Sequence, residues 1–130
     1  MVCLDTTFVA DLLRGSLQAK SIMESLDRGS SPITIASPSV MELIRGANLR
    51  TKAEERGKIL TMLRSLIILP LERESAILAG DLESELILGG EVIEPEDVMI
   101  AAIAQTHHET LLTRNQKHFA RIKDLKIQTY

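Results

Sequence analysis

Short apolar runs alternate with longer segments in which apolar residues recur at helical spacing. The short runs predict five strands, over 2–4, 33–36, 66–69, 110–113 and, as an edge strand, 126–129. The helical spacing predicts helices over 6–14, 16–28, 37–46, 51–64, 72–88, from Pro95 through the apolar stretch 98–104, and over 115–122. We expect Thr6 or Thr7 to cap the first of these helices, since both precede its apolar face.

Strands that alternate with helices predict an α/β protein whose parallel sheet is covered by helices on both faces. The connections between such strands are right-handed. In this class of fold, sites lie beyond the carboxyl ends of the strands, at the point where the strand order reverses. Polar residues just after the predicted strands are therefore the first candidates for chemistry.

Several polar side chains lie just after a predicted strand or in the first turns of a predicted helix. One carboxylate ends the first strand, one lies a turn into the helix after the second strand, and one lies in the first turn of the helix that begins at Pro95. A threonine, an arginine and an amide end the fourth strand. If the first and fourth strands are neighbours, all of these positions face one crevice. They are Asp5, Glu42, Asp97, Thr113, Arg114 and Asn115.

Clustered carboxylates repel one another, and at least one takes up a proton unless a cation lies between them. The three histidines and the one cysteine do not have the spacing of a zinc site. Carboxylate, amide and water oxygens suit Mg²⁺ or Mn²⁺. Such an ion binds phosphate oxygens and activates water, so the predicted reaction is hydrolysis of a phosphodiester bond.

Each carboxylate also has a simpler interpretation. Asp5 can cap a helix, Asp97 can favour the helix macrodipole, and Glu42 can be a surface glutamate. A second function class also stays open, in which the chain is a binding or regulatory module with little nuclease activity. The two classes differ in one observable, since only the first predicts RNA cleavage when Mg²⁺ or Mn²⁺ is supplied.

Composition sets the frame for these candidates. The 130 residues fit a single domain over 1–130, and Cys3 is the one cysteine, which excludes an intrachain disulfide and suits a reducing cytosol. No apolar run is long enough for a membrane span, so we expect a cytoplasmic protein that does not bind membranes. Net charge is −3, yet the segments 45–64 and 114–126 are rich in lysine and arginine. These segments are either a binding patch for a polyanion or solvated faces of helices.

Four motifs resemble PIN domains of the VapC toxin type, in the same order and at similar separations over essentially the whole chain. The third and fourth motifs together are the most specific. The motifs are Leu4-Asp5-Thr6-Thr7 with Ala10-Asp11-Leu12-Leu13-Arg14-Gly15, then Met41 to Gly46, then Asp97 to Ala104, and finally Leu112 to Asn115 with His118-Phe119.

The resemblance implies a three-layer α/β/α sandwich with a central parallel sheet of four to five strands. It also implies a Mg²⁺- or Mn²⁺-dependent endoribonuclease that leaves a 3′-hydroxyl and a 5′-phosphate. The activity would be that of a toxin, inhibited by a cognate antitoxin, in a homodimeric protein. An antitoxin tail that places an arginine among the carboxylates would block the crevice.

Carried over by position, the resemblance makes Asp5, Glu42 and Asp97 the metal-binding carboxylates. Thr7 or Thr113 would orient a carboxylate or a water. Asn115 takes the fourth site position, where many relatives have aspartate, so this site has three formal negative charges instead of four. The basic residues that we expect at RNA phosphates are Arg114, which lies inside the fourth motif, and Arg14 and Arg45, which close two site-bearing helices.

Overall fold

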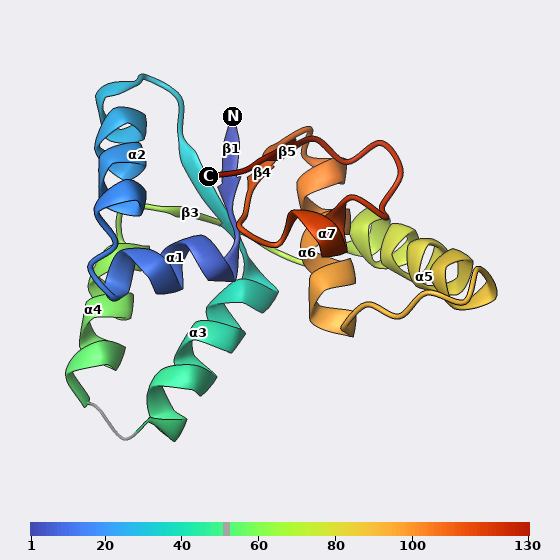
Figure 1. Cartoon of the computed structure of the whole chain (residues 1–130), viewed down its shortest axis with the longest axis horizontal. Helices are drawn as coiled ribbons and strands as arrows, with labels where there is room; N and C mark the ends of the chain where they lie inside the picture. Colours follow the sequence, from blue (N-terminus) through green and yellow to red (C-terminus); the bar gives the residue numbers. More distant parts are fainter. Residues whose placement is uncertain (51–52) are drawn as a thin grey trace.

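The computed structural model describes residues 1–50 and 53–130. Its strands are β1 (Val2–Leu4), β2 (Ile33–Ala36), β3 (Ile67–Leu69), β4 (Thr110–Leu112) and β5 (Ile127–Gln128). The helices of the described residues are α1 (Thr6–Leu13), α2 (Leu17–Arg28), α3 (Ser37–Leu49), α4 (Ala53–Leu63), α5 (Arg73–Leu88), α6 (Pro95–Thr106) and α7 (Gln116–Phe119). Figure 1 shows how they surround the central sheet.

The strands form one sheet in the order β3-β2-β1-β4-β5, and every neighbouring pair is parallel. The chain builds outward from β1 to β2 and β3, then crosses to the other side of β1 for β4 and β5. The strand order therefore reverses between β1 and β4. This confirms the predicted parallel sheet. The first and fourth strands are neighbours, which is the condition under which the candidate residues were expected to meet.

Successive strand residues point to opposite faces of the sheet, which divides the core in two. Leu4 and Ile35 pack with residues of α1 to α4. Cys3 and Leu111 pack with residues of α5, α6 and α7 on the other face. The predicted three-layer α/β/α sandwich is thus confirmed, with one helical layer on each side of the sheet (Figure 1).

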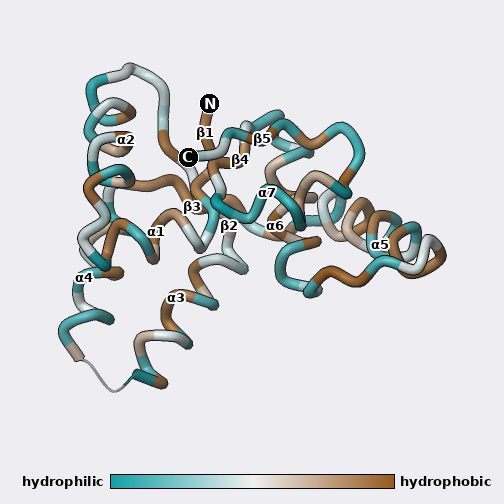
Figure 2. Tube along the Cα trace, viewed as in Figure 1, coloured by the Kyte–Doolittle hydropathy of each residue, from teal (hydrophilic) through white to brown (hydrophobic). Residues whose placement is uncertain are grey.

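The outer helices are amphipathic. Figure 2 shows apolar and polar residues alternating along α5. In α6, the apolar segment 98–104 is buried except for Met99, which is half-buried. The longest helix, α5, has 16 residues, and no helix in the described part of the chain is long and apolar enough to cross a membrane.

Two predicted helix ends are wrong. The helix expected over 37–46 continues to Leu49, because Gly46 has ordinary helical geometry and lies under the side chain of Arg50. The helix expected over 115–122 ends at Phe119. A tight turn follows, in which the N–H of Ile122 donates to the carbonyl of Phe119, and both side chains are buried in the core. The predicted start of the fourth helix at Thr51 lies outside the described residues.

Cys3 is expected to resist thiol reagents in the folded protein. Its side chain is fully buried in β1, and burial raises the pKa of the thiol to about 12, with the nearby carboxylate of Glu109 adding to the effect. The thiolate is the reactive form and is therefore almost absent at pH 8. A chromogenic disulfide reagent should give no colour until denaturant is added. Rapid labelling of the native chain at pH 8 would contradict this placement.

Candidate active site

Asp5 directly follows β1, at the place where the strand order reverses between β1 and β4. Its backbone N–H donates to the carbonyl of Leu112 over 3.0 Å, which ties the ends of the two strands together. The side chain is 1% exposed. Its Oδ2 accepts the hydroxyls of Thr7 at 2.8 Å and Thr113 at 2.7 Å. Its Oδ1 is buried and has no hydrogen-bond partner among the described residues. A buried carboxylate oxygen without a donor is costly, so this atom requires an explanation.

Two threonine hydroxyls hold Asp5 in place from both strand ends. Each donates to Oδ2 of Asp5, and each also accepts a backbone N–H from the loop after β4. The N–H of Arg114 reaches Thr7 Oγ1 at 3.2 Å, and the N–H of Asn115 reaches Thr113 Oγ1 at 2.9 Å. These backbone donors occupy hydroxyl lone pairs and leave the hydroxyl protons for Asp5. The network therefore fixes which oxygen of Asp5 is satisfied.

The predicted helix cap is wrong. Asp5 is the N-cap residue of α1, but its side chain makes no capping hydrogen bond. Thr6 and Thr7 lie in the first turn, and their hydroxyls are already used by carboxylates. Thr6 donates to Glu42 Oε1 over 2.9 Å. The polar side chains at the start of α1 thus face the crevice and its carboxylates, and the helix terminus is left without a side-chain cap.

Glu42 comes from α3 and is half-buried. Besides accepting from Thr6, it lies 4.0 Å from the guanidinium of Arg45. Burial raises the pKa of the Glu42 carboxyl, and the negative charges of Asp5 and Glu96 raise it further, against the lowering effects of Thr6 and Arg45. A carboxylate that responds to Asp5 and Glu96 belongs to a shared acidic environment.

Asp97 completes this environment from the first turn of α6. Burial is the main cause that raises its pKa, to about 7, and the charge of Asp5 is the next. Further contributions come from Glu42, Glu94 and Glu96. The three carboxylates predicted to meet thus influence one another electrostatically across β1, α3 and α6. Their mutual repulsion is the feature that a cation would relieve.

The side chains are not yet arranged as a closed metal cage. Among residues 1–50 and 53–130, no group of three or more His, Cys, Asp and Glu side chains has the geometry to hold a metal ion. The Glu42 carboxylate instead contacts the hydroxyl of Thr6 and the guanidinium of Arg45. Asn115 lies at the rim as the N-cap of α7, and its side chain makes no cap hydrogen bond. Its backbone N–H, which donates to Thr113, links it to the crevice.

The arginines expected at phosphates lie in two places. Arg45 spans α3 and α6, with its guanidinium 3.5 Å from Glu96 and 4.0 Å from Glu42. Arg114 and Arg14 both approach a residue that the sequence did not single out, Asp11. Asp11 Oδ1 lies 3.2 Å from Arg114 Nη1 and 3.6 Å from Arg14 Nη1.

Asp11 also accepts a hydrogen bond from the hydroxyl of Tyr130 to its Oδ2, at 2.6 Å. Burial raises the pKa of the Tyr130 hydroxyl, and the hydrogen bond to Asp11 raises it further, so the phenol stays a donor. The Tyr130 ring packs edge-on against Phe8 at 5.3 Å. A signal for this cluster was present in the sequence, since Asp11 interrupts the apolar face of α1 three residues before an arginine.

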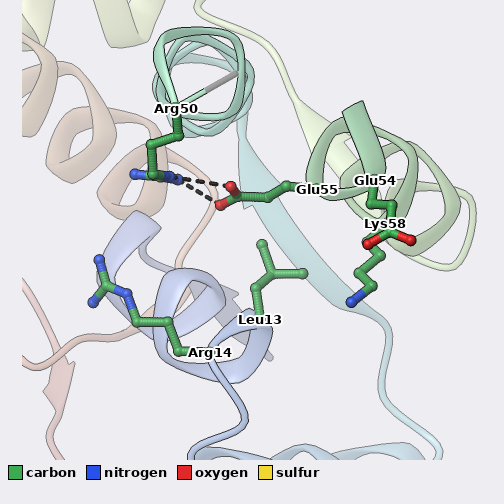
Figure 3. A pocket seen from close by; sticks show the side chains of 6 residues that line it. All are labelled: Leu13, Arg14, Arg50, Glu54, Glu55 and Lys58. Carbon is green, nitrogen blue, oxygen red and sulfur yellow. Dashed lines mark hydrogen bonds and ion pairs between the residues drawn. The ribbon is translucent and has the colours of Figure 1, made fainter. Parts of the chain in front are cut away.

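Arg14 also borders a cavity of about 370 Å³ between the end of α1, the end of α3 and the first turns of α4 (Figure 3). Arg50 and Glu55 form an ion pair across its wall. The cavity therefore carries basic side chains from three helices, although acidic ones accompany them. Its lining consists of Leu13, Arg14, Arg50, Glu54, Glu55 and Lys58.

The chain is similar in sequence to known proteins over most of its length. The family model described as "PIN domain" matches residues 2–125. The "tRNA(fMet)-specific endonuclease VapC" of Salmonella typhimurium is 31% identical over 111 residues, which cover 84% of this chain and 83% of the relative. "Ribonuclease VapC1" of Rickettsia felis is 31% identical over 130 residues, which cover 97% and 93%.

Among solved structures, VapBC2 of Rickettsia felis bound to a DNA fragment from its promoter superposes with a TM-score of 0.89 at 27% identity, over 100% of this chain and 99% of the other. VapBC-1 of nontypeable Haemophilus influenzae gives a TM-score of 0.87 at 26% identity, over 99% and 98%. This chain and each of these two structures match over nearly the full length of both chains. The chain belongs to the PIN domain family and is a VapC-type member of it.

Proposed function

We propose that the chain is a divalent-metal-dependent endoribonuclease and the toxin of a toxin–antitoxin pair. The VapC relatives are named as ribonucleases or a tRNA-specific endonuclease, which supports nuclease activity on RNA. The observation that carries the metal-dependent part is Asp5, a buried carboxylate with one oxygen held by two hydroxyls and the other without a donor among the described residues.

Mg²⁺ or Mn²⁺ fits the residues present. Asp5 Oδ1 offers an oxygen that no donor of the described chain occupies, and Asp97 and Glu42 supply two more carboxylates in the same acidic environment. Hard oxygen donors are the ligands that these ions prefer. When bound, such an ion supplies charge neutralisation and an activated water for attack on a phosphodiester.

The chain's own residues have separate tasks in this proposal. The hydroxyls of Thr7 and Thr113 keep the Asp5 carboxylate from rotating. Oδ2 therefore stays with these donors, and Oδ1 stays directed away from them. Glu42 has to exchange its contact with Thr6 for the ion. Asp97 can hold a proton near neutral pH until the cation arrives, which limits repulsion in the crevice.

Asn115 stands at the fourth position without a charge. Its amide oxygen can bind an ion or a water but adds nothing to the attraction for a cation. With formal charge from Asp5, Glu42 and Asp97 alone, we infer one tightly held ion. A second ion would bind more weakly than in relatives that have aspartate at this position.

The proposed partners are RNA, a cognate antitoxin and a second copy of the chain. The solved complexes of VapC with VapB support the antitoxin. A homodimer needs an apolar surface, and helices on both faces of the sheet expose large apolar side chains that could contribute to one. On α3 and α4 these are Met41, Leu49 and Leu60, and on α5 they are Ile77, Ile87 and Leu88.

The proposal is tested with purified protein and a panel of transfer and messenger RNAs, in buffer with Mn²⁺, with Mg²⁺ or with excess EDTA. We expect cleavage at discrete positions with either ion and none in EDTA. The products should carry 5′-phosphate ends, because attack by water on phosphorus expels the 3′-oxygen as a hydroxyl. Ends that carry a cyclic phosphate, or equal cleavage in EDTA, would assign the activity to a contaminating metal-independent nuclease.

The alternative function, a binding module, has its own outcome in this experiment. An intact RNA panel in Mn²⁺, together with a stable complex with the antitoxin, would favour it over the nuclease.

A further inference from the structure

We propose that Asp11 is a positioning residue that holds Arg114 and Arg14 as a paired guanidinium site for backbone phosphates of single-stranded RNA. The inference rests on the proposed ribonuclease function and goes beyond it by naming a substrate-binding element next to the carboxylates. Asp11 itself does not touch the RNA. It acts through the two arginines.

The geometry of Asp11 fits an anchor for other side chains. It is 7% exposed, and both of its oxygens are occupied. Oδ1 faces Arg114 and Arg14, while Oδ2 accepts the hydroxyl of Tyr130. With Oδ2 fixed by this hydrogen bond, the carboxylate cannot rotate freely. The fixed position of Oδ1 therefore determines where the two guanidinium groups lie.

The two arginines keep most of their donors for a ligand. The side chains of Arg14 and Arg114 are 65% and 55% exposed. In the described part of the chain, Asp11 is the one carboxylate that pairs with either guanidinium. Each guanidinium has five N–H donors in a planar fork that matches phosphate oxygens. Two positive charges around one carboxylate leave a net charge of one, which favours an anion.

The pair lies close to the proposed centre of cleavage. The backbone N–H of Arg114 donates to Thr7 Oγ1, and the same hydroxyl donates to Asp5. Thr7 and Asp11 are four residues apart on α1 and therefore share a helix face. A phosphate on the arginine pair would thus lie near the phosphate presented to the carboxylates, as successive phosphates of one strand do.

Asp11 also keeps the Arg114 guanidinium away from the three carboxylates of the proposed active site. A free Arg114 side chain at the end of β4 would be attracted to the acidic crevice formed by Asp5, Glu42 and Asp97, where it would compete with a cation. The ion pair with Asp11 keeps the guanidinium outside this crevice, with its remaining donors available to a ligand.

The experiment measures RNA binding separately from cleavage. Fluorescence anisotropy of a labelled single-stranded RNA is recorded in EDTA over a series of NaCl concentrations, and RNA integrity is checked on a gel. The variants are Asp11→Asn, Arg14→Gln, Arg114→Gln and the double variant that combines Asp11→Asn with Arg114→Gln. Arg28→Gln is the matched control, because this exposed residue precedes β2 at the opposite end of the sheet.

Asp11→Asn is expected to weaken RNA binding about threefold to tenfold, as for a loosened charge-assisted hydrogen bond. It should also reduce the slope of log affinity against log salt by about 0.7 for each phosphate that the protein no longer neutralises. If only net charge mattered, Asp11→Asn would bind RNA more tightly, since the substitution removes a negative charge from the protein. The double variant should be weaker than Arg114→Gln by less than the full Asp11→Asn effect, because Asp11 acts through the arginines.

Binding by Asp11→Asn that equals or exceeds that of the unmodified chain would overturn the proposal. So would an unchanged salt slope with only a lower melting temperature, which would leave Asp11 as an anchor for Tyr130 alone. If Asp11→Asn does not fold, Arg14→Gln and Arg114→Gln decide the matter, since slopes equal to that of Arg28→Gln exclude the paired site. Cleavage of RNA by the unmodified chain in Mn²⁺, measured in parallel, tells failure of this inference from failure of the proposed nuclease.

Discussion

Asp5→Asn is expected to lower the rate of RNA cleavage in Mn²⁺ by about a thousandfold or more while the fold persists. Loss of one preorganised electrostatic group at a reacting centre typically costs a factor of that order. The amide oxygen can still accept from Thr7 and Thr113, so the strand ends stay joined. The amide nitrogen, however, takes the place of Oδ1, where it removes a negative charge and presents donors to a cation.

The measurement is the single-turnover cleavage rate of a labelled RNA, combined with thermal melting in the presence and absence of Mn²⁺. The unmodified chain should melt at a higher temperature with Mn²⁺, because an ion that binds only the folded state stabilises it. Asp5→Asn should lose most of this shift. The matched control is Asp27→Asn, an exposed aspartate on α2, which should cleave at the normal rate. Cleavage by Asp5→Asn within tenfold of the unmodified chain would exclude Asp5 from the reaction.

Much of the fold could be predicted because its signals are local. The strands are short apolar runs, and the helices show clear spacing with glycine or proline near their ends. The pairing of β1 with β4 is not local, and the sequence left it as a condition. Given this pairing, the candidate residues lie where the strand order of the parallel sheet reverses. The errors fell on helix ends, at Leu49 and Phe119, where side-chain packing over Gly46 and burial of Ile122 decide the outcome.

The candidate site was predictable in its charges but not in its hydrogen bonds. Asp5, Glu42 and Asp97 follow strand ends or begin helices, so topology brings them into one acidic environment. The roles of Thr6 and Asp11 depend on side-chain directions across two elements. Thr6 reaches Glu42 over 36 positions of sequence, and Asp11 meets Tyr130 over 119. The sequence marks Asp11 as a charged residue on an apolar helix face, but no local signal indicates that it meets Tyr130 or that Thr6 meets Glu42.

The second large effect concerns Asp97, whose substitution should separate stability from activity. Asp97→Asn is expected to stabilise the metal-free chain above pH 7 and to abolish RNA cleavage in Mn²⁺. The carboxylate is half-buried beside Asp5 and Glu42, and its pKa in the folded chain is about 7, against 3.8 for an unperturbed aspartate. The ionised form is therefore disfavoured in the folded state.

The sign of the pH dependence follows from linkage. Below about pH 4 the carboxyl is protonated in both the folded and the unfolded chain and does not affect stability. Between about pH 4 and pH 7 the unfolded chain loses this proton first, so the free energy of unfolding falls as the pH rises. Above pH 7 the penalty is constant. Because Asp97 is partly exposed, solvent screening reduces it to about 1–2 kcal/mol, or roughly 3–8 °C in melting temperature.

Asparagine has no such charge, so the melting temperatures of Asp97→Asn and the unmodified chain in EDTA should diverge as the pH rises from 5 to 8. Residue Asp81 is an exposed carboxylate on α5, so Asp81→Asn is the matched control and should show no divergence.

Addition of Mn²⁺ at pH 8 should reverse the order of the two melting temperatures, because only the unmodified chain is stabilised by the ion. Equal melting temperatures of the two chains at pH 8 in EDTA would mean that the ionised Asp97 carboxylate carries no penalty, either from burial or from the charges of Asp5 and Glu42. The physical reason for a cation in the crevice would then be lost, even if Asp97→Asn fails to cleave RNA. A stabilised but inactive variant, in contrast, would identify Asp97 as a group kept at a cost in stability because the reaction requires its charge.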